Sequence, residues 1–134
     1  MKILTIMVML LGSLSTIADK NENAKMKLAH AENISVQLFD AIEKNNLIVP
    51  GKSEKQLNEE VSQLALEKFG IEKHWHKKIV RAGRNTQVTY SDNPPNIVMQ
   101  SDDIIVVDYG IIVDGWEADY ARTYVLGKDP KKLK

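Results

Sequence analysis

Residues 104–126 form the stretch that most constrains the fold of this chain. Ile104 to Val113 is apolar and rich in β-branched residues, as expected for a strand that is buried on both faces. The pair Asp114-Gly115 predicts a tight two-residue turn, because both central residues of a type I′ turn need positive φ angles. A second extended segment follows this turn, so the sequence predicts a β-hairpin.

The register that such a turn imposes brings two acidic residues together. It pairs Gly110 with Asp119. It also pairs Asp108 with Ala121. Side chains alternate between the two faces of a strand, so Asp108 and Asp119 share one face. Their backbones are diagonal neighbours roughly 7–8 Å apart, and the small residues Gly110 and Ala121 leave room between the carboxylates.

Two carboxylates on a mostly apolar sheet repel each other and lose hydration. Either one of them stays protonated, or a cation lies between them. A pair of divalent metal ions roughly 3.5–4 Å apart fits this gap. The alternative is that Asp108 and Asp119 each meet a solvent-exposed edge or a lysine.

Two helices are predicted before the hairpin. Apolar residues recur at spacings of three and four from Ala24 onward, which predicts an amphipathic helix that ends near Asn45-Asn46. Ser53 has the residue type and position of a helix cap, and Gly70 ends this second helix.

Two further extended segments are predicted between the helices and the hairpin. Residues 72–80 are expected to be extended, and residues 87–90 to form a short strand. The chain is therefore expected to have an α+β fold, with two N-terminal helices packed on an antiparallel sheet that ends in the hairpin.

The segment 72–80 contains two histidines. His74 and His76 alternate across Trp75, so on a strand both imidazoles face the same way. Two histidines at this spacing can bind a metal, but no third ligand lies at a zinc-like spacing. We therefore favour the interpretation that they hydrogen-bond to neighbours near a cleft. The local basic cluster is expected to be a solvated strand face and turn; its members are Lys77, Lys78, Arg81 and Arg84.

The N-terminal residues 1–18 differ from the rest of the chain. A positive start at Lys2, an apolar run and small residues up to Ala18 are typical of a secretory signal peptide. Residues 19–24 are polar and are expected to form a flexible linker. The signal predicts a secreted or periplasmic protein. The alternative is a buried N-terminal helix or strand of a cytoplasmic protein, with translation starting at Met26.

The composition limits the possible partners. The 134 residues are 43% hydrophobic and 27% charged, which is ordinary for a soluble globular domain, and the formal net charge is zero. We therefore expect no nucleic-acid partner, and no membrane partner once a signal is cleaved. The absence of cysteine excludes disulfides and thiol chemistry.

Several segments of this sequence resemble the pita-bread metallopeptidases, which include methionine aminopeptidase, aminopeptidase P and prolidase. They are Val-Val-Asp-Tyr-Gly at 106–110, Gly-Trp-Glu-Ala-Asp-Tyr-Ala-Arg-Thr at 115–123, His-Trp-His-Lys-Lys-Ile-Val-Arg-Ala-Gly-Arg-Asn-Thr at 74–86, and Asn-Pro-Pro at 93–95. The Asp-x-x-Arg-Thr ending at 119–123 is more similar to the aminopeptidase P and prolidase branch. The resemblance covers residues 25–134.

The resemblance implies a fold, a metal centre and a reaction. The fold is half of a pita-bread domain, with its helices on a curved antiparallel sheet. Asp108 and Asp119 are the first two of five ligands to two divalent metal ions, which are manganese, cobalt, zinc or iron. The metals activate a bridging water and polarise the scissile carbonyl, so that N-terminal residues are removed from a peptide substrate, in one branch before proline.

The resemblance also draws attention to Tyr90. Many family members carry a substrate-contacting histidine eighteen residues before the first metal aspartate, and Tyr90 holds that position here. A tyrosine can donate a hydrogen bond but is not protonated to a cation near neutral pH. The alternative is that Tyr90 is a half-buried strand residue.

The other three ligands that the resemblance implies are a histidine and two glutamates downstream of the hairpin. No histidine or glutamate follows Asp119 in this sequence, so we expect this chain alone to bind metal weakly and to be inactive. We expect a truncated domain whose exposed sheet edge is covered by a second half or by another copy of the chain. The alternatives are a non-catalytic peptide- or protein-binding module of the same shape, and a non-functional fragment.

Overall fold

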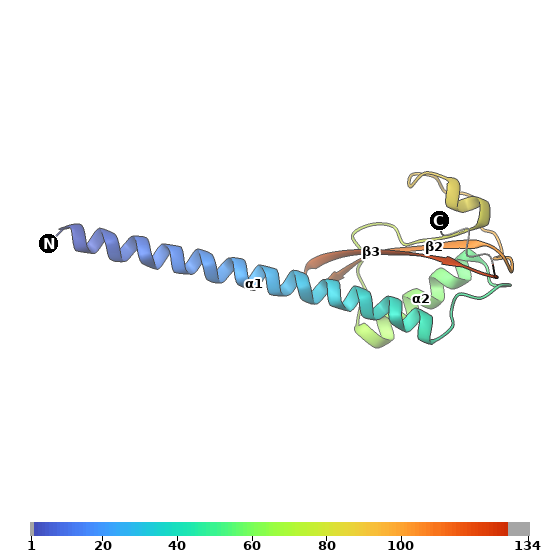
Figure 1. The fold of residues 1–134 in the computed structure, drawn as a ribbon, viewed down its shortest axis with the longest axis horizontal. Helices are drawn as coiled ribbons and strands as arrows, with labels where there is room; N and C mark the ends of the chain where they lie inside the picture. The colour runs from blue at the N-terminus through green and yellow to red at the C-terminus, as the bar shows by residue number, and fades with distance from the viewer. Residues whose placement is uncertain (1, 129–134) are drawn as a thin grey trace.

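The fold consists of two helices packed against one sheet (Figure 1). The computed structural model describes residues 2–128, with side chains from residue 19 onward. The elements are α1 (Lys2–Lys44), α2 (Glu54–Phe69), β1 (Ile79–Ala82), the 3-10 helix η1 (Gly83–Gln87), β2 (Ile104–Val113) and β3 (Trp116–Val125). The sheet is antiparallel with strand order β1-β2-β3, and the predicted α+β class is confirmed.

Helix α1 ends where the sequence predicts but begins much earlier. It stops at Lys44, and Asn46 adopts the left-handed conformation with a φ of 50°. Residues 19–24, for which the sequence predicts a flexible linker, are helical. Their lysine, glutamate and alanine residues are good helix formers, and the Nζ of Lys25 lies 4.0 Å from Oε1 of Glu22 on the next turn.

The signal peptide at residues 1–18 stays a prediction. Met1 and the side chains of residues 2–18 lie outside the described part of the structure. Among the residues that are described, no helix combines the length and the apolar character that crossing a membrane requires.

Helix α2 begins and ends at the predicted residues. The Oγ atom of Ser53 accepts a hydrogen bond of 3.1 Å from the backbone N–H of Gln56, which caps the start of the helix. Gly70 ends the helix with a φ of 66°, and its N–H donates back into the last turn. The buried face of α2 packs into the core through Leu57, Val61 and Ala65.

The helices cover one face of the sheet. Alternate side chains of β2 point into this core and are fully buried; they are Ile105, Val107, Tyr109 and Ile111. Phe39 of α1 packs on Tyr120 of β3, with ring centroids 4.9 Å apart. Arg122 of β3 donates a hydrogen bond of 2.7 Å to Glu43 of α1. The opposite face of the β2–β3 hairpin therefore points away from the helices.

The two extended segments predicted between the helices and the hairpin are shorter than expected. Of the segment 72–80, only residues 79–80 lie in a strand, at the start of β1, and residues 87–90 finish the 3-10 helix and enter a turn. Arg81 is buried and accounts for that turn, because its guanidinium donates hydrogen bonds to carbonyl oxygens of the loop. The acceptors are the carbonyl oxygens of Val88, Thr89 and Asp92, at 2.7, 2.9 and 3.1 Å. Arg81 is therefore not part of a solvated basic face.

Candidate metal centre

The β2–β3 hairpin has the predicted turn and register. Both turn residues have positive φ angles, at 50° and 83°, as a type I′ turn requires. Gly110 pairs with Asp119 across the ladder. Asp108 pairs with Ala121. The two aspartates therefore lie on the same face of the hairpin, the one that points away from the helices, as the sequence predicts.

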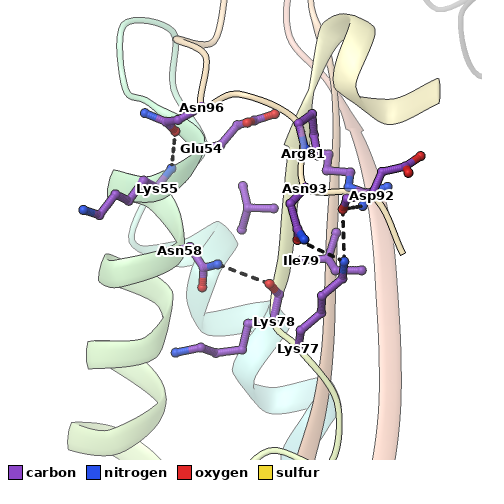
Figure 2. Close-up of a pocket in the computed structure, with 12 residues that line it drawn as sticks. Glu54, Lys55, Asn58, Lys77, Lys78, Ile79, Arg81, Asp92, Asn93 and Asn96 are labelled. Atoms are coloured by element: carbon purple, nitrogen blue, oxygen red, sulfur yellow. Dashed lines mark hydrogen bonds between the residues drawn. The ribbon is translucent and has the colours of Figure 1, made fainter. Parts of the chain in front are cut away.

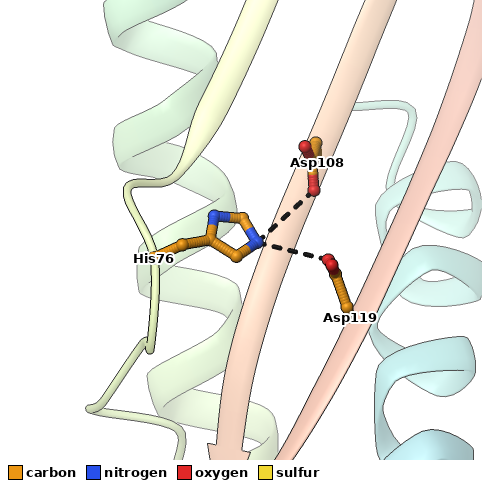
Figure 3. A group of neighbouring side chains, drawn as sticks. All are labelled: His76, Asp108 and Asp119. Atoms are coloured by element: carbon orange, nitrogen blue, oxygen red, sulfur yellow. Dashed lines mark hydrogen bonds and ion pairs between the residues drawn. The ribbon is translucent and has the colours of Figure 1, made fainter. Parts of the chain in front are cut away.

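A histidine completes a cluster with the two aspartates (Figure 3). Its Nε2 atom, on His76, lies 3.2 Å from Oδ1 of Asp119 and 3.6 Å from Oδ1 of Asp108. One ligand atom from each of the three residues lies within 4.8 Å of the others. The exposed fraction of the side chain is 8% for His76, 28% for Asp108 and 57% for Asp119, so the cluster opens to solvent on the side of Asp119.

The close contacts in this cluster shift two pKa values. Burial lowers the pKa of His76, but the hydrogen bonds of its ring to the Lys77 carbonyl oxygen and to Asp119, with the charges of both carboxylates, raise it overall. Burial raises the pKa of Asp108; the charge of His76 opposes this change and Asp119 adds to it. The cluster thus favours a positive charge between the two acids, whether an imidazolium or a metal ion supplies it.

His76 reaches the aspartates because the backbone bulges just before β1. The pairings on either side of the bulge place the four residues 75–78 opposite only two residues of β2. A bulge interrupts the alternation of side chains between the two faces of a strand, so positions on either side of it no longer follow the two-residue period.

The prediction that His74 and His76 face the same way is therefore wrong. The ring of His74 packs 5.6 Å from that of Tyr109, which points into the core. His76 contacts Asp108. Asp108 is next to Tyr109 in β2, so its side chain points to the face opposite the core. In the described residues Nε2 of His74 has no hydrogen-bond partner, whereas His76 makes the hydrogen bonds that the favoured interpretation expects.

Gly110 makes the space that the ring of His76 occupies. A Cβ atom on Gly110 would lie 2.1 Å from Cδ2 of His76 and 2.5 Å from Nε1 of Trp75. Gly110 is not among the glycines with positive φ, so glycine is needed here for space and not for backbone conformation. The room that the sequence predicts between the carboxylates is thus partly filled by an imidazole and an indole.

Tyr90, the predicted substrate-contacting residue, lies beside the cluster. Its ring centroid is 6.1 Å from that of His76, and Nζ of Lys77 lies 4.7 Å from the centroid of the Tyr90 ring. Tyr90 belongs to a turn and is 53% exposed, so it is not the half-buried strand residue of the alternative interpretation. Its contact with substrate stays a prediction.

A polar hollow lies between α2 and residues 77–81 (Figure 2). Its lining includes Glu54, a carboxylate that is only 7% exposed. Glu54 accepts hydrogen bonds from the backbone N–H of Ala82 at 2.7 Å and from Nδ2 of Asn85 at 2.9 and 3.1 Å. These bonds join the start of α2 to the end of β1, so we assign Glu54 a structural role.

The donor atoms of the cluster suit a divalent transition metal. Carboxylate oxygen and imidazole nitrogen are the ligands that zinc, iron and cobalt accept in proteins. His76 and Asp119 are 43 positions apart in the sequence, yet their side chains meet within hydrogen-bond distance. The sequence indicates both aspartates through the hairpin motif, but it gives no sign that the bulge brings in His76.

Known structures of three peptidases resemble this chain. Prolidase from Thermococcus sibiricus matches with a TM-score of 0.71 and 23% identity over 83% of this chain. X-Pro aminopeptidase from Thermotoga maritima matches with a TM-score of 0.70 and 24% identity over 84% of this chain. Xaa-Pro dipeptidase from Bacillus anthracis matches with a TM-score of 0.66 and 25% identity over 79% of this chain. This chain spans only 30%, 31% and 29% of their respective lengths.

These structural matches confirm the predicted pita-bread fold for the part of the domain that this chain contains. Comparison with curated protein sequences gives no match. Residues 26–134 match the sequence profile of Metallopeptidase family M24. That match covers most of the chain, including the part of α1 that packs on the sheet, all of α2, the bulge and the aspartate hairpin. The chain therefore belongs to metallopeptidase family M24.

Proposed function

We propose that this chain supplies the two-aspartate half of a dinuclear metallopeptidase centre that removes N-terminal residues from peptides, including residues before proline. The observation that carries the proposal is the meeting of Asp108 and Asp119 on one open face of the hairpin. Family membership supports peptidase chemistry. The names X-Pro aminopeptidase and Xaa-Pro dipeptidase, carried by two structural neighbours, support the preference for proline.

The carboxylates of Asp108 and Asp119 fit the metals that the family resemblance implies, which are manganese, cobalt, zinc or iron. When bound, two such ions lower the pKa of a water molecule and polarise the scissile carbonyl. Asp108 offers its carboxylate from the half-buried base of the cluster, and Asp119 offers its own from the exposed side that a peptide can approach. Arg122 holds β3 against α1 and so keeps Asp119 in register with β2.

Tyr90 lies where it can contact a bound peptide. Its exposed ring stands next to His76, at the rim of the cluster. We propose that its hydroxyl donates a hydrogen bond to the substrate, since a phenol is a neutral donor at physiological pH. Tyr90→Phe should then raise KM without removing the metal.

The centre needs further ligands besides the two aspartates. By the family resemblance these are a histidine and two glutamates, supplied by a second half of the domain. In the described part of the chain β3 pairs only with β2, so its outer edge is free. A second half or another copy of the chain would cover this edge and the open face of the hairpin.

The first experiment measures the chain by itself. The purified chain, supplied with excess manganese, should not hydrolyse an Xaa-Pro dipeptide, because a centre with so few ligands does not hold both metals in place. Turnover that survives repurification, and that is lost in Asp108→Ala, would overturn this expectation.

The second experiment completes the centre. The chain is fused to the part of the Thermotoga maritima X-Pro aminopeptidase that follows the segment matched by this chain, and hydrolysis of Xaa-Pro peptides is measured. We expect activity that Asp108→Ala and Asp119→Ala both remove. A fusion that folds, binds metal and hydrolyses no N-terminal peptide bond would refute the peptidase proposal and favour a non-catalytic peptide-binding module.

A further inference from the structure

The ring of His76 has a feature of a metal ligand besides its position. Its Nδ1 atom lies 2.7 Å from the carbonyl oxygen of Lys77, and only a protonated Nδ1 can donate this hydrogen bond. A histidine that binds a metal through one nitrogen almost always donates from the other, which fixes the tautomer and the orientation of the ring. In His76 that arrangement leaves Nε2 for the metal, and Nε2 is the atom that faces both aspartates (Figure 3).

The distances around Nε2 match the spacing of ligand atoms around one ion. Zinc and similar ions hold nitrogen and oxygen ligands at about 2.0–2.2 Å, so neighbouring ligand atoms lie about 3.0–3.5 Å from each other. Nε2 of His76 lies 3.2 Å from Oδ1 of Asp119 and 3.6 Å from Oδ1 of Asp108. Only small side-chain movements are needed for all three atoms to contact the same ion.

Packing also holds the ring of His76 in this orientation. The space above Gly110 receives the ring, and the indole of Trp75 stands edge-on to it with centroids 4.5 Å apart. The side chain is 8% exposed. A ligand that is already ordered loses little conformational freedom on binding, which increases the affinity of the site.

We propose that His76, Asp108 and Asp119 form a three-ligand site that binds one transition-metal ion within this chain. The imidazole favours zinc, cobalt, nickel or iron over magnesium and manganese. This inference rests on the proposed function for the two aspartates and adds His76, a residue outside the ligand set that the family resemblance implies. It also replaces the expectation of weak metal binding by this chain alone, because a third ligand lets the chain hold one ion by itself.

The same histidine has a competing role that the experiment must separate. As an imidazolium, His76 would donate from Nδ1 to Lys77 and from Nε2 to Asp119, and would simply neutralise the two acids. In that role Nε2 never contacts a metal. The two roles therefore differ in what added metal does to Nε2.

The affinity experiment uses the full chain after removal of metal. Zn²⁺ is titrated by calorimetry, and Co²⁺ by its visible absorption, which reports the ligand set directly. We expect one ion per chain, with an affinity that His76→Ala lowers by at least about tenfold. The matched control is His30→Ala, which removes an exposed histidine of α1 and should leave the affinity unchanged.

A second measurement does not depend on any variant that could fail to fold. The chain contains three histidines, so the ring nitrogens can be followed individually by long-range ¹H–¹⁵N NMR during addition of Zn²⁺. We expect a large shift of Nε2 of His76 at one equivalent, with little change at His74 and His30. An Nε2 resonance of His76 that stays unchanged when zinc is bound, or a folded His76→Ala that binds zinc as tightly as the wild type, would overturn the proposal.

Failure of the peptidase function would look different. A completed centre that binds zinc through His76 but hydrolyses no peptide would refute the function and leave this site standing. Peptide hydrolysis with metal bound only by the aspartates would refute the role of His76 and leave the function standing.

Discussion

Gly110→Ala is the smallest change that should disturb the candidate centre. The added Cβ would lie 2.1 Å from Cδ2 and 2.4 Å from Nε2 of His76, and 2.5 Å from Nε1 of Trp75. Ordinary van der Waals contact begins at 3.4 Å, and the backbone of β2 is paired on both sides. The imidazole therefore has to move by more than about 1 Å, since a well-packed backbone yields less than a side chain.

The cost can be worked out from what the ring loses. Overpacking of a filled site costs about 1–3 kcal/mol. Displacement of the ring also weakens its hydrogen bonds to Lys77 and Asp119, for which about 1 kcal/mol more is reasonable. We therefore expect Gly110→Ala to lower the free energy of unfolding by about 2–4 kcal/mol, a large share of the total stability of a small domain. Zinc affinity should fall as in His76→Ala.

The assay is urea unfolding, with zinc calorimetry on the same samples. Ala121→Ser is the control, because it adds an atom at an exposed position on the same face and should change stability by less than about 0.5 kcal/mol. In a His76→Ala background two of the three nearest atoms are gone, so Gly110→Ala should cost much less there. Equal costs in both backgrounds, or an alanine variant with wild-type stability and zinc affinity, would refute the reasoning.

Two further predictions concern residues outside the cluster. Glu54→Gln should lower the free energy of unfolding by about 2–3 kcal/mol in a urea titration, because its amide would face the donors of Ala82 and Asn85 in place of a carboxylate oxygen; wild-type stability would contradict this. The hydroxyl and N–H of Thr89 both donate to Oδ2 of Asp92 and hold the pKa of Asp92 below its usual range, so its contribution to stability is present above the unfolded-state pKa and lost as the pH falls through the lower folded-state pKa. Thr89→Val should raise the pKa of Asp92 in an NMR titration, and an unchanged titration curve would contradict the assignment.

The features that could be predicted from the sequence are those that short segments decide. Two turn residues fix the register of the hairpin, so the shared face of Asp108 and Asp119 follows from counting residues. The boundaries of α2 follow from Ser53 and Gly70, because capping and the left-handed conformation are properties of single residues. Each of these features depends on residues that are near one another in the chain.

The features that could not be predicted depend on contacts between distant segments. The turn at 87–90 replaces a predicted strand because Arg81 binds its carbonyl oxygens. The length of α1 is a different case, because local helix formers extend it through residues 19–24, where the polar composition suggests a linker. The bulge before β1 is set by how residues 75–78 fit against β2, and no residue type in that segment marks it.

The bulge explains how this hairpin can carry two acids on one face. Asp108 is half-buried, and its neighbour Asp119 adds a second negative charge a short distance away. In a regular strand His76 would lie on the same face as His74, whose ring packs against Tyr109 in the core. No imidazole would then reach the two aspartates. The two extra residues, together with the missing side chain of Gly110, let His76 stand between the acids. As an imidazolium, His76 neutralises the two aspartates; when a metal ion replaces the proton on Nε2, the same ring supplies a nitrogen ligand. His76→Ala should therefore both destabilise the metal-free chain and weaken its zinc binding.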